Sequence, residues 1–176
     1  MRVSKHTKPD WSQVATILIA FLALGLSMYE FRAARQHERL SVKPILQFER
    51  VNAPVEGYPQ PGIHLVNCGN GVALLESLTV YVDGKPVQPA GQASVLEETT
   101  RTLGLLEGQD FQVAYSISLA QALPAQQRRL LIGMKNGGDY TPERGAVLNG
   151  ALARVEARVT YRSLYGDAYE SALTRP

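Results

Sequence analysis

The stretch ARVEARVTYR, residues 153–162, alternates apolar and polar side chains from end to end. Successive side chains of a β-strand point to opposite faces of a sheet. The alternation therefore predicts a strand with one face in a core and the other in water. The side chains expected inside are Val155, Ala157, Val159 and Tyr161, and those expected outside are Arg154, Glu156, Arg158 and Thr160.

The same period of two recurs along the chain from Pro44 onward. Alternation is typical of antiparallel sheets, whereas strands of parallel sheets are apolar on both faces. About seven or eight strands at this spacing predict an antiparallel, immunoglobulin-like β-sandwich. The strand candidates are PILQFERV (44–51), GIHLVN (62–67), SLTVYV (77–82), FQVAYSI (111–117), RRLLIGM (128–134) and, as an edge strand, DAYESAL (167–173).

Short polar stretches separate the predicted strands. Asp83-Gly84, between TVYV and KPV, favours a two-residue hairpin turn. Residues 91–104 and 119–127 show no clear period and are compatible with short helical turns. Other turns are predicted where Gly, Pro, Asn or Asp gather, at residues 58–62, 107–109, 136–139 and 166–167.

An uncharged apolar stretch runs from Val14 to Tyr29. With its flanks it would reach roughly 31 Å as a helix, the thickness of a hydrocarbon core. Trp11 and Tyr29 stand at its ends, where aromatic rings prefer the membrane interface. A cleaved signal peptide is the alternative, but apolar residues continue beyond the loose cleavage motif Ala23-Leu24-Gly25. We therefore predict one transmembrane helix over residues 14–31.

This helix divides the chain into four predicted parts. A short basic tail, residues 1–13, precedes the transmembrane helix of residues 14–31. A helical stalk, residues 32–43, follows until Pro44 ends it, and the β-sandwich takes residues 44–176. Small residues share one face of the transmembrane helix, which leaves pairing into a homo-oligomer open. They are Thr16, Ala20, Ala23 and Ser27.

The net charge of +2 comes from the flanks of the apolar stretch, because residues 44–176 carry more acidic than basic side chains. A nucleic-acid partner is therefore not expected, and anionic lipid headgroups are the expected partner of the flanks. The basic residues on the two sides are nearly balanced, but the short basic tail predicts a cytoplasmic N-terminus. The domain is thus expected outside the cytoplasm, attached to the inner (cytoplasmic) membrane.

The sequence offers no constellation of residues for catalysis or metal binding. Its histidines, His6, His37 and His64, are scattered, and Cys68 has no second cysteine beside which to bind a metal. A G-x-S-x-G motif is missing, so Ser163 is interpreted as a polar residue at a strand end. We expect no catalytic, metal or cofactor site, and we interpret His64 as an outer-face strand residue.

The stretch NCGNG, residues 67–71, raises the question of a phosphate-binding loop. A third glycine is missing, and the residues that follow predict a strand where such a loop needs a helix. We expect Gly69 and Gly71 to have positive φ angles in a turn or bulge, held by the side chain of Asn67. Cys68 is expected to be semi-buried, with an intermolecular disulfide as the alternative.

The segment LVNCGNGVALLESLTVYVDGKPV is similar to the pattern Leu-x-Asn-x-Gly-x-Gly-x-Ala, an alternating strand and Asp-Gly. With VTYRSLYGDAY, residues 159–169, it resembles bacterial membrane-anchored proteins that carry an extracytoplasmic immunoglobulin-like β-sandwich. Val72 departs from that pattern, in which proline often precedes the alanine. The resemblance implies the sandwich and the anchored arrangement, and it brings no catalytic residues. It rests on Leu65, Asn67, Gly69, Gly71, Ala73, Asp83 and Gly84.

The leading hypothesis is a single-pass membrane protein, not an enzyme, that presents a β-sandwich for protein interaction or envelope scaffolding. The predicted edge strand DAYESAL would pair with a partner strand. The alternative is an extracytoplasmic domain that binds a small molecule or glycan by stacking on clustered tyrosines. These are Tyr58, Tyr81, Tyr115, Tyr140, Tyr161, Tyr165 and Tyr169.

Overall fold

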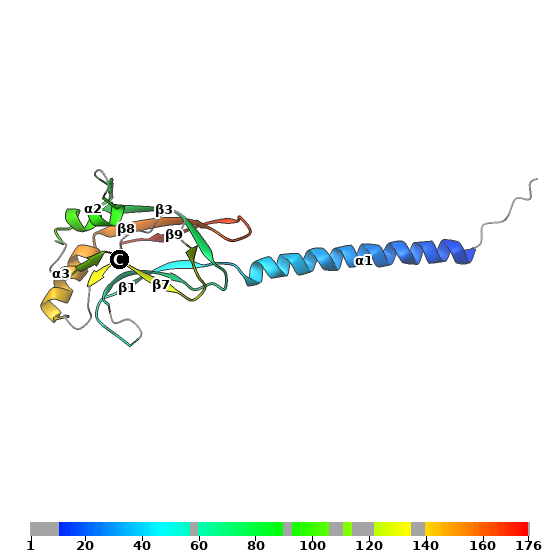
Figure 1. Ribbon diagram of the computed structural model, residues 1–176, viewed down its shortest axis with the longest axis horizontal. Coiled ribbons are helices and arrows are strands. Elements are labelled where there is room, and N and C mark those ends of the chain that lie inside the picture. The colour runs from blue at the N-terminus through cyan, green and yellow to red at the C-terminus, as the bar shows by residue number, and fades with distance from the viewer. Residues whose placement is uncertain are drawn as a thin grey trace, which may run out of the picture. The chain divides into compact units, whose positions relative to one another are not determined.

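The computed structural model describes residues 11–56, 60–89, 93–105, 111–113, 122–134 and 140–175. Contacts divide the chain into unit 1, Met1–Ser41, and unit 2, Val42–Pro176. Figure 1 shows a helix in unit 1 and strands with short helices in unit 2. Several expected features lie outside the described residues: the end of the predicted strand at 114–117, the turns at 107–109 and 136–139, and residues 58–59 of another loop.

Helix α1, Trp11–Ser41, takes up the predicted transmembrane segment and most of the predicted stalk. Among the described residues it is the helix long and apolar enough to cross a membrane. None of its side chains is buried within the protein. The helix ends before Pro44, which disfavours the helical conformation in the residue that precedes it. Membrane anchoring through α1 is consistent with these features.

The first sheet of unit 2 is antiparallel, with the strand order β1-β2-β7-β5. Phe48 lies opposite Leu65 in the pair β1–β2, and Ile63 opposite Ile132 in the pair β2–β7. The order differs from the chain order because β7 adds beside β2 from much later in the sequence. The strands are β1 (Leu46–Val51), β2 (Gly62–Asn67), β5 (Phe111–Val113) and β7 (Arg128–Met134).

The second sheet is also antiparallel, with the order β4-β3-β8-β9 and β6 beside the start of β3. Strands β3 and β4 are joined by Asp83 and Gly84, whose φ angles of 51° and 75° suit the predicted two-residue hairpin. A hydrogen bond from Arg154 lowers the pKa of Asp83. The strands are β3 (Ala73–Val82), β4 (Lys85–Pro86), β6 (Ala122–Leu123), β8 (Val155–Arg162) and β9 (Ala168–Leu173).

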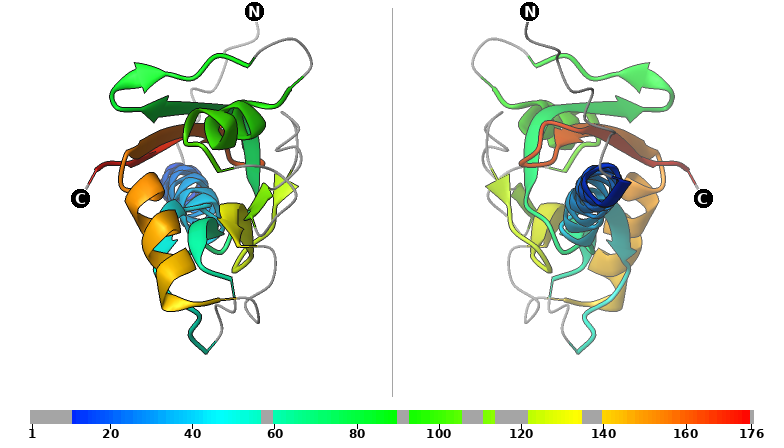
Figure 2. Two further views of the ribbon diagram at one scale, coloured as in Figure 1. Left: turned by 90° about the vertical axis from the view of Figure 1, so that its left-hand side faces the viewer. Right: turned by 90° about the vertical axis from the view of Figure 1, so that its right-hand side faces the viewer.

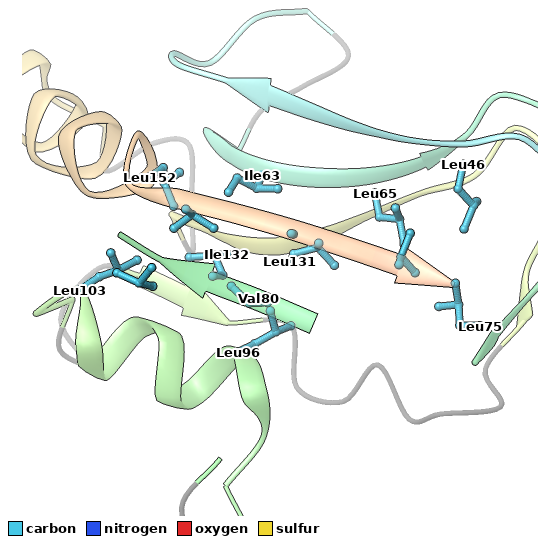
Figure 3. Close-up of a cluster of buried hydrophobic side chains, with 14 of the residues drawn as sticks. Leu46, Ile63, Leu65, Leu75, Val80, Leu96, Leu103, Leu131, Ile132 and Leu152 are labelled. Atoms are coloured by element: carbon cyan, nitrogen blue, oxygen red, sulfur yellow. The ribbon is translucent and has the colours of Figure 1, made fainter. Parts of the chain in front are cut away.

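Both sheets contribute to one hydrophobic core, in which Leu65 and Leu131 of the first sheet and Val80 of the second are buried (Figure 3). The alternation in β8 is confirmed, because Val155, Ala157, Val159 and Tyr161 are all buried. Arg50 ties the sheets further by donating to the carbonyl of Val155 at 2.7 Å. The fold is therefore mainly β, with two antiparallel sheets around a shared core.

Two short helices close one end of unit 2 (Figure 1; left view of Figure 2). α2 (Val95–Thr102) lies within residues 91–104, where a helical turn was expected, and a capping box between Ser94 and Glu97 begins it. α3 (Pro142–Leu152) was not predicted. The other expected helical turn is wrong in its described part, since residues 122–127 hold β6 and a non-helical turn.

Candidate functional site

Residues 42–45, here called the entry segment, connect α1 to β1 and lie against the loop that follows β2. The N–H of Cys68 donates to the carbonyl of Ile45 at 2.8 Å, and the N–H of Gly71 donates to the carbonyl of Lys43 at 3.4 Å. The N–H of Ile45 donates to Oδ1 of Asn67 at 3.2 Å. The chain is therefore fixed in place at the point where it enters unit 2.

Asn67 is fully buried and its side chain holds three segments together. Its Oδ1 accepts from the N–H of Gly69 at 3.1 Å, in addition to that of Ile45 in the entry segment. Its Nδ2 donates to the carbonyls of Gly71, Leu123 and Pro124, at 2.7, 3.0 and 3.1 Å. The prediction that this side chain holds a turn is confirmed, and two segments far apart in the sequence are held as well.

Gly69 and Gly71 lie directly under the entry segment. A Cβ on Gly71 would collide with the carbonyl of Val42, and one on Gly69 would collide with the carbonyl of Lys43. The predicted positive φ angles are wrong, because neither glycine is in that region of backbone conformation. Glycine is required here for space and not for a left-handed turn. We call Asn67, Gly69 and Gly71 the entry clip.

Cys68 is exposed, which corrects the expectation of a semi-buried side chain. Its Sγ lies 3.7 Å from Oε1 of Gln47, a weak contact at the surface. Its backbone, by contrast, takes part in the strand-like pairing with Ile45. The thiol therefore points into solvent from a rigid backbone.

His64 is 3% exposed, so its interpretation as a solvent-facing residue of the outer face is wrong. Its Nε2 lies 2.9 Å from the carbonyl of Gln60, to which it donates. Burial is the largest influence on the pKa of His64 and lowers it. The hydrogen bond to the carbonyl of Gln60 opposes this, the charge of Arg128 lowers the pKa further, and that of Glu49 raises it slightly, so the net pKa is lowered. The imidazole is therefore held mainly in its neutral form.

Ser163 is buried and shapes the loop between β8 and β9. Its Oγ accepts from the N–H groups of Tyr165 and Asp167 and donates to the carboxylate of Asp167, each at 3.2 Å. The N–H of Ser163 also donates to the carbonyl of Asp167 at 2.9 Å. Its interpretation as a strand-end polar residue holds, and its hydroxyl fixes a loop whose tip is Leu164 and Tyr165.

Strand β9 is the last strand of its sheet among the described residues, as expected of an edge strand. Its side chains alternate between exposed and half-buried positions. Arg158 of β8 pairs with Glu170 of β9 at 2.9 Å across the exposed face. Strand β1 of the other sheet lies close to β9. The outer face of β8 and β9 consists of Glu156, Arg158, Thr160, Arg162, Ala168, Glu170 and Ala172.

The described tyrosines do not gather on one exposed surface. Tyr161 is 4% exposed and its ring stacks on Tyr169 with centroids 5.6 Å apart. Tyr81 lies near the C-terminal end of β3, away from this pair. The ring of Tyr140 packs against Gly145 of α3. Tyr58 and Tyr115 lie outside the described residues. A stacking platform for a glycan therefore has no support from these positions.

The adjacent carboxylates of α2 have structural partners. Glu97 accepts from the N–H of Ser94 at 2.7 Å in the capping box, and Glu98 pairs with Arg101 at 2.8 Å. Within the described ranges no group of three or more His, Cys, Asp or Glu side chains is placed to hold a metal ion. These carboxylates serve helix α2.

A cavity of about 380 Å³ lies between β3 and the start of α2. Its walls are mostly apolar, with Leu78 and Val95 partly buried against the core. Thr79 and Ser94 supply hydroxyl groups at its surface. The volume is within the range of small-molecule sites, which is about 300–1,000 Å³.

Comparison of the sequence with protein-family models and with curated proteins gives no match. The resemblance to membrane-anchored β-sandwich proteins therefore stays a prediction.

Proposed function

We propose that this chain is a single-pass membrane protein that presents unit 2 outside the cytoplasm as a non-catalytic domain for protein interaction or scaffolding. The observation that carries the proposal is α1, a helix of 31 residues with no buried side chain. Leu22 is 73% exposed and Phe21 68%. Exposing such apolar side chains to water costs free energy, whereas lipid acyl chains accommodate them. Unit 2 begins directly after this helix.

The proposed orientation has the N-terminus in the cytoplasm. It is supported by the short basic tail before the helix and by the rule that long domains are translocated largely regardless of their charge. Cys68 tests it, since it is the single cysteine of the chain and is exposed. A membrane-impermeant maleimide added to intact cells is expected to label the protein at Cys68. In the matched variant Cys68→Ser with Ser4→Cys, labelling is expected only after lysis. The reverse pattern would place the domain in the cytoplasm.

The proposed contact surface is the outer face of β8 and β9. Arginine is enriched in protein interfaces, and this face presents Arg158 and Arg162 beside the small side chains of Ala168 and Ala172. Because β1 already lies near β9, a partner approaches this outer face more easily than it adds a strand at the edge. The immunoglobulin-like assignment of the two sheets belongs to the same proposal.

Photocrosslinking in the native membrane tests this surface. A photoreactive residue at Ala172 is expected to give one dominant protein adduct, identified by mass spectrometry. The matched control is Ala146, which is exposed on α3 and outside the proposed surface. Equal adducts from both positions, or none from Ala172 and Ala168, would contradict the contact surface.

A second candidate function, binding of an apolar small molecule, is favoured by the cavity between β3 and α2. Native mass spectrometry of the protein released from its membrane would detect a bound molecule. Val95→Trp would fill the cavity and is expected to abolish the adduct. Val147→Trp, at an exposed position of α3 outside the cavity, is expected to keep the adduct. Absence of any adduct in the unmodified protein would remove this candidate.

A further inference from the structure

The cavity between β3 and α2 opens where the hairpin of β3 and β4 comes to an end. Just beyond β4, the N–H of Val87 donates to the carbonyl of Val80 at 2.8 Å. In the same register Pro89 would lie opposite Leu78. Proline has no N–H to donate to a neighbouring strand, so this bond cannot form. The chain therefore leaves β3 beside Leu78, and both Pro89 and Leu78 line the cavity.

Both walls of this cavity are held in fixed conformations. On one side β3 is paired with β8, so that Leu78 lies opposite Val159. On the other side the capping box between Ser94 and Glu97 fixes the start of α2. Leu96 of α2 is 2% exposed and belongs to the hydrophobic core (Figure 3). A cavity whose walls are already ordered binds a ligand with little loss of conformational entropy.

None of the described residues that line the cavity carries a charge. Leu78, Val87 and Val95 supply apolar surface that is partly buried against the core. A charged group that leaves water for such surroundings loses hydration without gaining an ionic partner. An anion would also be repelled by Glu97, whose carboxylate accepts from the N–H of the lining residue Ser94 at 2.7 Å. These features favour an uncharged ligand.

Two hydroxyl groups supply hydrogen-bond donors at the cavity surface. The hydroxyl of Thr79, which lines the cavity, makes no hydrogen bond to the described residues. The Oγ of Ser94 accepts from the N–H of Glu97 at 3.1 Å, which leaves its own hydrogen available to donate. A carbonyl oxygen only accepts hydrogen bonds, so it complements these donors, whereas a purely apolar ligand would cover them without giving them a partner.

We propose that the cavity between β3 and α2 binds an uncharged, mainly apolar carbonyl compound, whose carbonyl oxygen accepts a hydrogen bond from the hydroxyl of Thr79. The inference rests on the second candidate function and adds to it the chemical class of the ligand, which is a neutral amide, ester or ketone. The volume of about 380 Å³ limits this ligand to a compact apolar body. A charged molecule of the same shape is expected to bind more weakly.

Three probes of similar shape and different charge test the proposal on the full-length chain in lipid nanodiscs. Cyclohexanecarboxamide, cyclohexanecarboxylate and cyclohexylmethylamine carry the same apolar ring and are neutral, anionic and cationic at neutral pH. Saturation-transfer difference NMR measures the binding of each probe, and empty nanodiscs give the background from lipid. The carboxamide is expected to bind several-fold more tightly than either charged probe.

Two conservative variants test the proposed contacts, with near-ultraviolet circular dichroism as the check that each is folded. Thr79→Val keeps a similar shape and removes the hydroxyl, so it is expected to weaken carboxamide binding several-fold. Glu97→Gln keeps an acceptor for the N–H of Ser94 and removes the charge. It is expected to strengthen carboxylate binding and to leave carboxamide binding unchanged. Carboxamide binding that is unaffected by Thr79→Val would overturn the inference.

Val95→Trp separates the inference from the candidate function on which it rests. This variant fills the cavity and is expected to abolish carboxamide binding, whereas Val147→Trp, outside the cavity, is expected to keep it. Equal binding of all three probes, lost in Val95→Trp, would overturn the choice of a neutral carbonyl compound and leave the cavity as a small-molecule site. If no probe shows binding that Val95→Trp removes, the inference and the candidate function both fail.

Discussion

At the residue scale, the entry clip shows which parts of a local motif can be predicted from sequence. The role of Asn67 was predictable, because asparagine side chains commonly bond to backbone groups in turns. Its partners Ile45, Leu123 and Pro124 were not, because they reach Asn67 only through the fold. The glycines were identified, but for the wrong reason, since the steric demand comes from residues 42–45.

Asn67→Ala is expected to lower the free energy of unfolding of unit 2 by about 3 kcal/mol or more. The substitution leaves buried N–H and carbonyl groups of three segments without partners. Urea unfolding of the full chain in detergent, followed by the near-ultraviolet circular dichroism of its tyrosines, measures the change. Asn70→Ala, in the same loop but exposed, is the control and is expected within about 0.5 kcal/mol of the unmodified protein. Equal effects of the two would contradict the clip.

His64 shows a second limit of sequence periodicity. The alternation of β2 puts His64 on the face opposite to Ile63 and Leu65, but it does not say whether that face is covered. Both faces of β2 are largely buried in the structure. An alternating sequence therefore predicts which face of the sheet a side chain lies on. Whether that face is exposed depends on the tertiary structure.

The lowered pKa of His64 predicts that unit 2 loses stability on acidification. In the unfolded chain the imidazole takes up a proton as pH falls below about 6.5, whereas the folded protein resists this protonation. Stability is therefore full above that pH and declines as pH falls towards the lower pKa of the folded state. His6 and His37 precede unit 2, so His64 is its single histidine.

Urea unfolding between pH 7.5 and pH 5, followed by tyrosine circular dichroism, measures this decline. His64→Gln keeps an N–H donor for the carbonyl of Gln60 and removes the titration, so its stability is expected to fall less over the same pH range. A decline as steep as that of the unmodified chain would assign the pH dependence to other groups.

At the element scale, the longer strands and α1 followed from periodicity and hydropathy, whereas α3 and the short strand β6 were missed. The sequence of α3, PERGAVLNGAL, contains two glycines, which weaken a helical pattern. The signal present was Thr141 as N-cap, followed by Pro142 and Glu143 in the first turn. Leu148 and Leu152, one turn apart, supply its buried side chains. Gly145 makes room for the ring of Tyr140, a requirement that sequence does not reveal.

Two glycine substitutions are expected to act in opposite directions. Gly71→Ala places a methyl group on the backbone of Val42 and is expected to destabilise unit 2 by about 1–3 kcal/mol. Gly150→Ala, at a position of α3 with open space around it, is expected to stabilise unit 2 by about 0.5 kcal/mol. Thermal unfolding of the two variants side by side measures both. Stabilisation by Gly71→Ala would show that the entry segment does not lie against this loop.

At the scale of the whole molecule, the division after Ser41 predicts where unit 2 begins as a folding unit. A fragment of residues 42–176 is expected to unfold cooperatively in urea, because it keeps the entry segment and its bonds to Asn67 and Cys68. A fragment of residues 46–176 begins at β1 and lacks those bonds, so its unfolding midpoint is expected to be clearly lower. Equal midpoints would mean that the entry segment adds nothing to stability.

The entry clip also determines how tension would pass through the protein. A pulling force on α1 enters unit 2 at Val42 and reaches the backbone bonds of Lys43 and Ile45 before it reaches any strand pair of the sheets. Stretching a single molecule by its two ends is therefore expected to show an early, small extension when the residue 42–45 segment detaches. The separation of β1 from β2 would follow at greater extension.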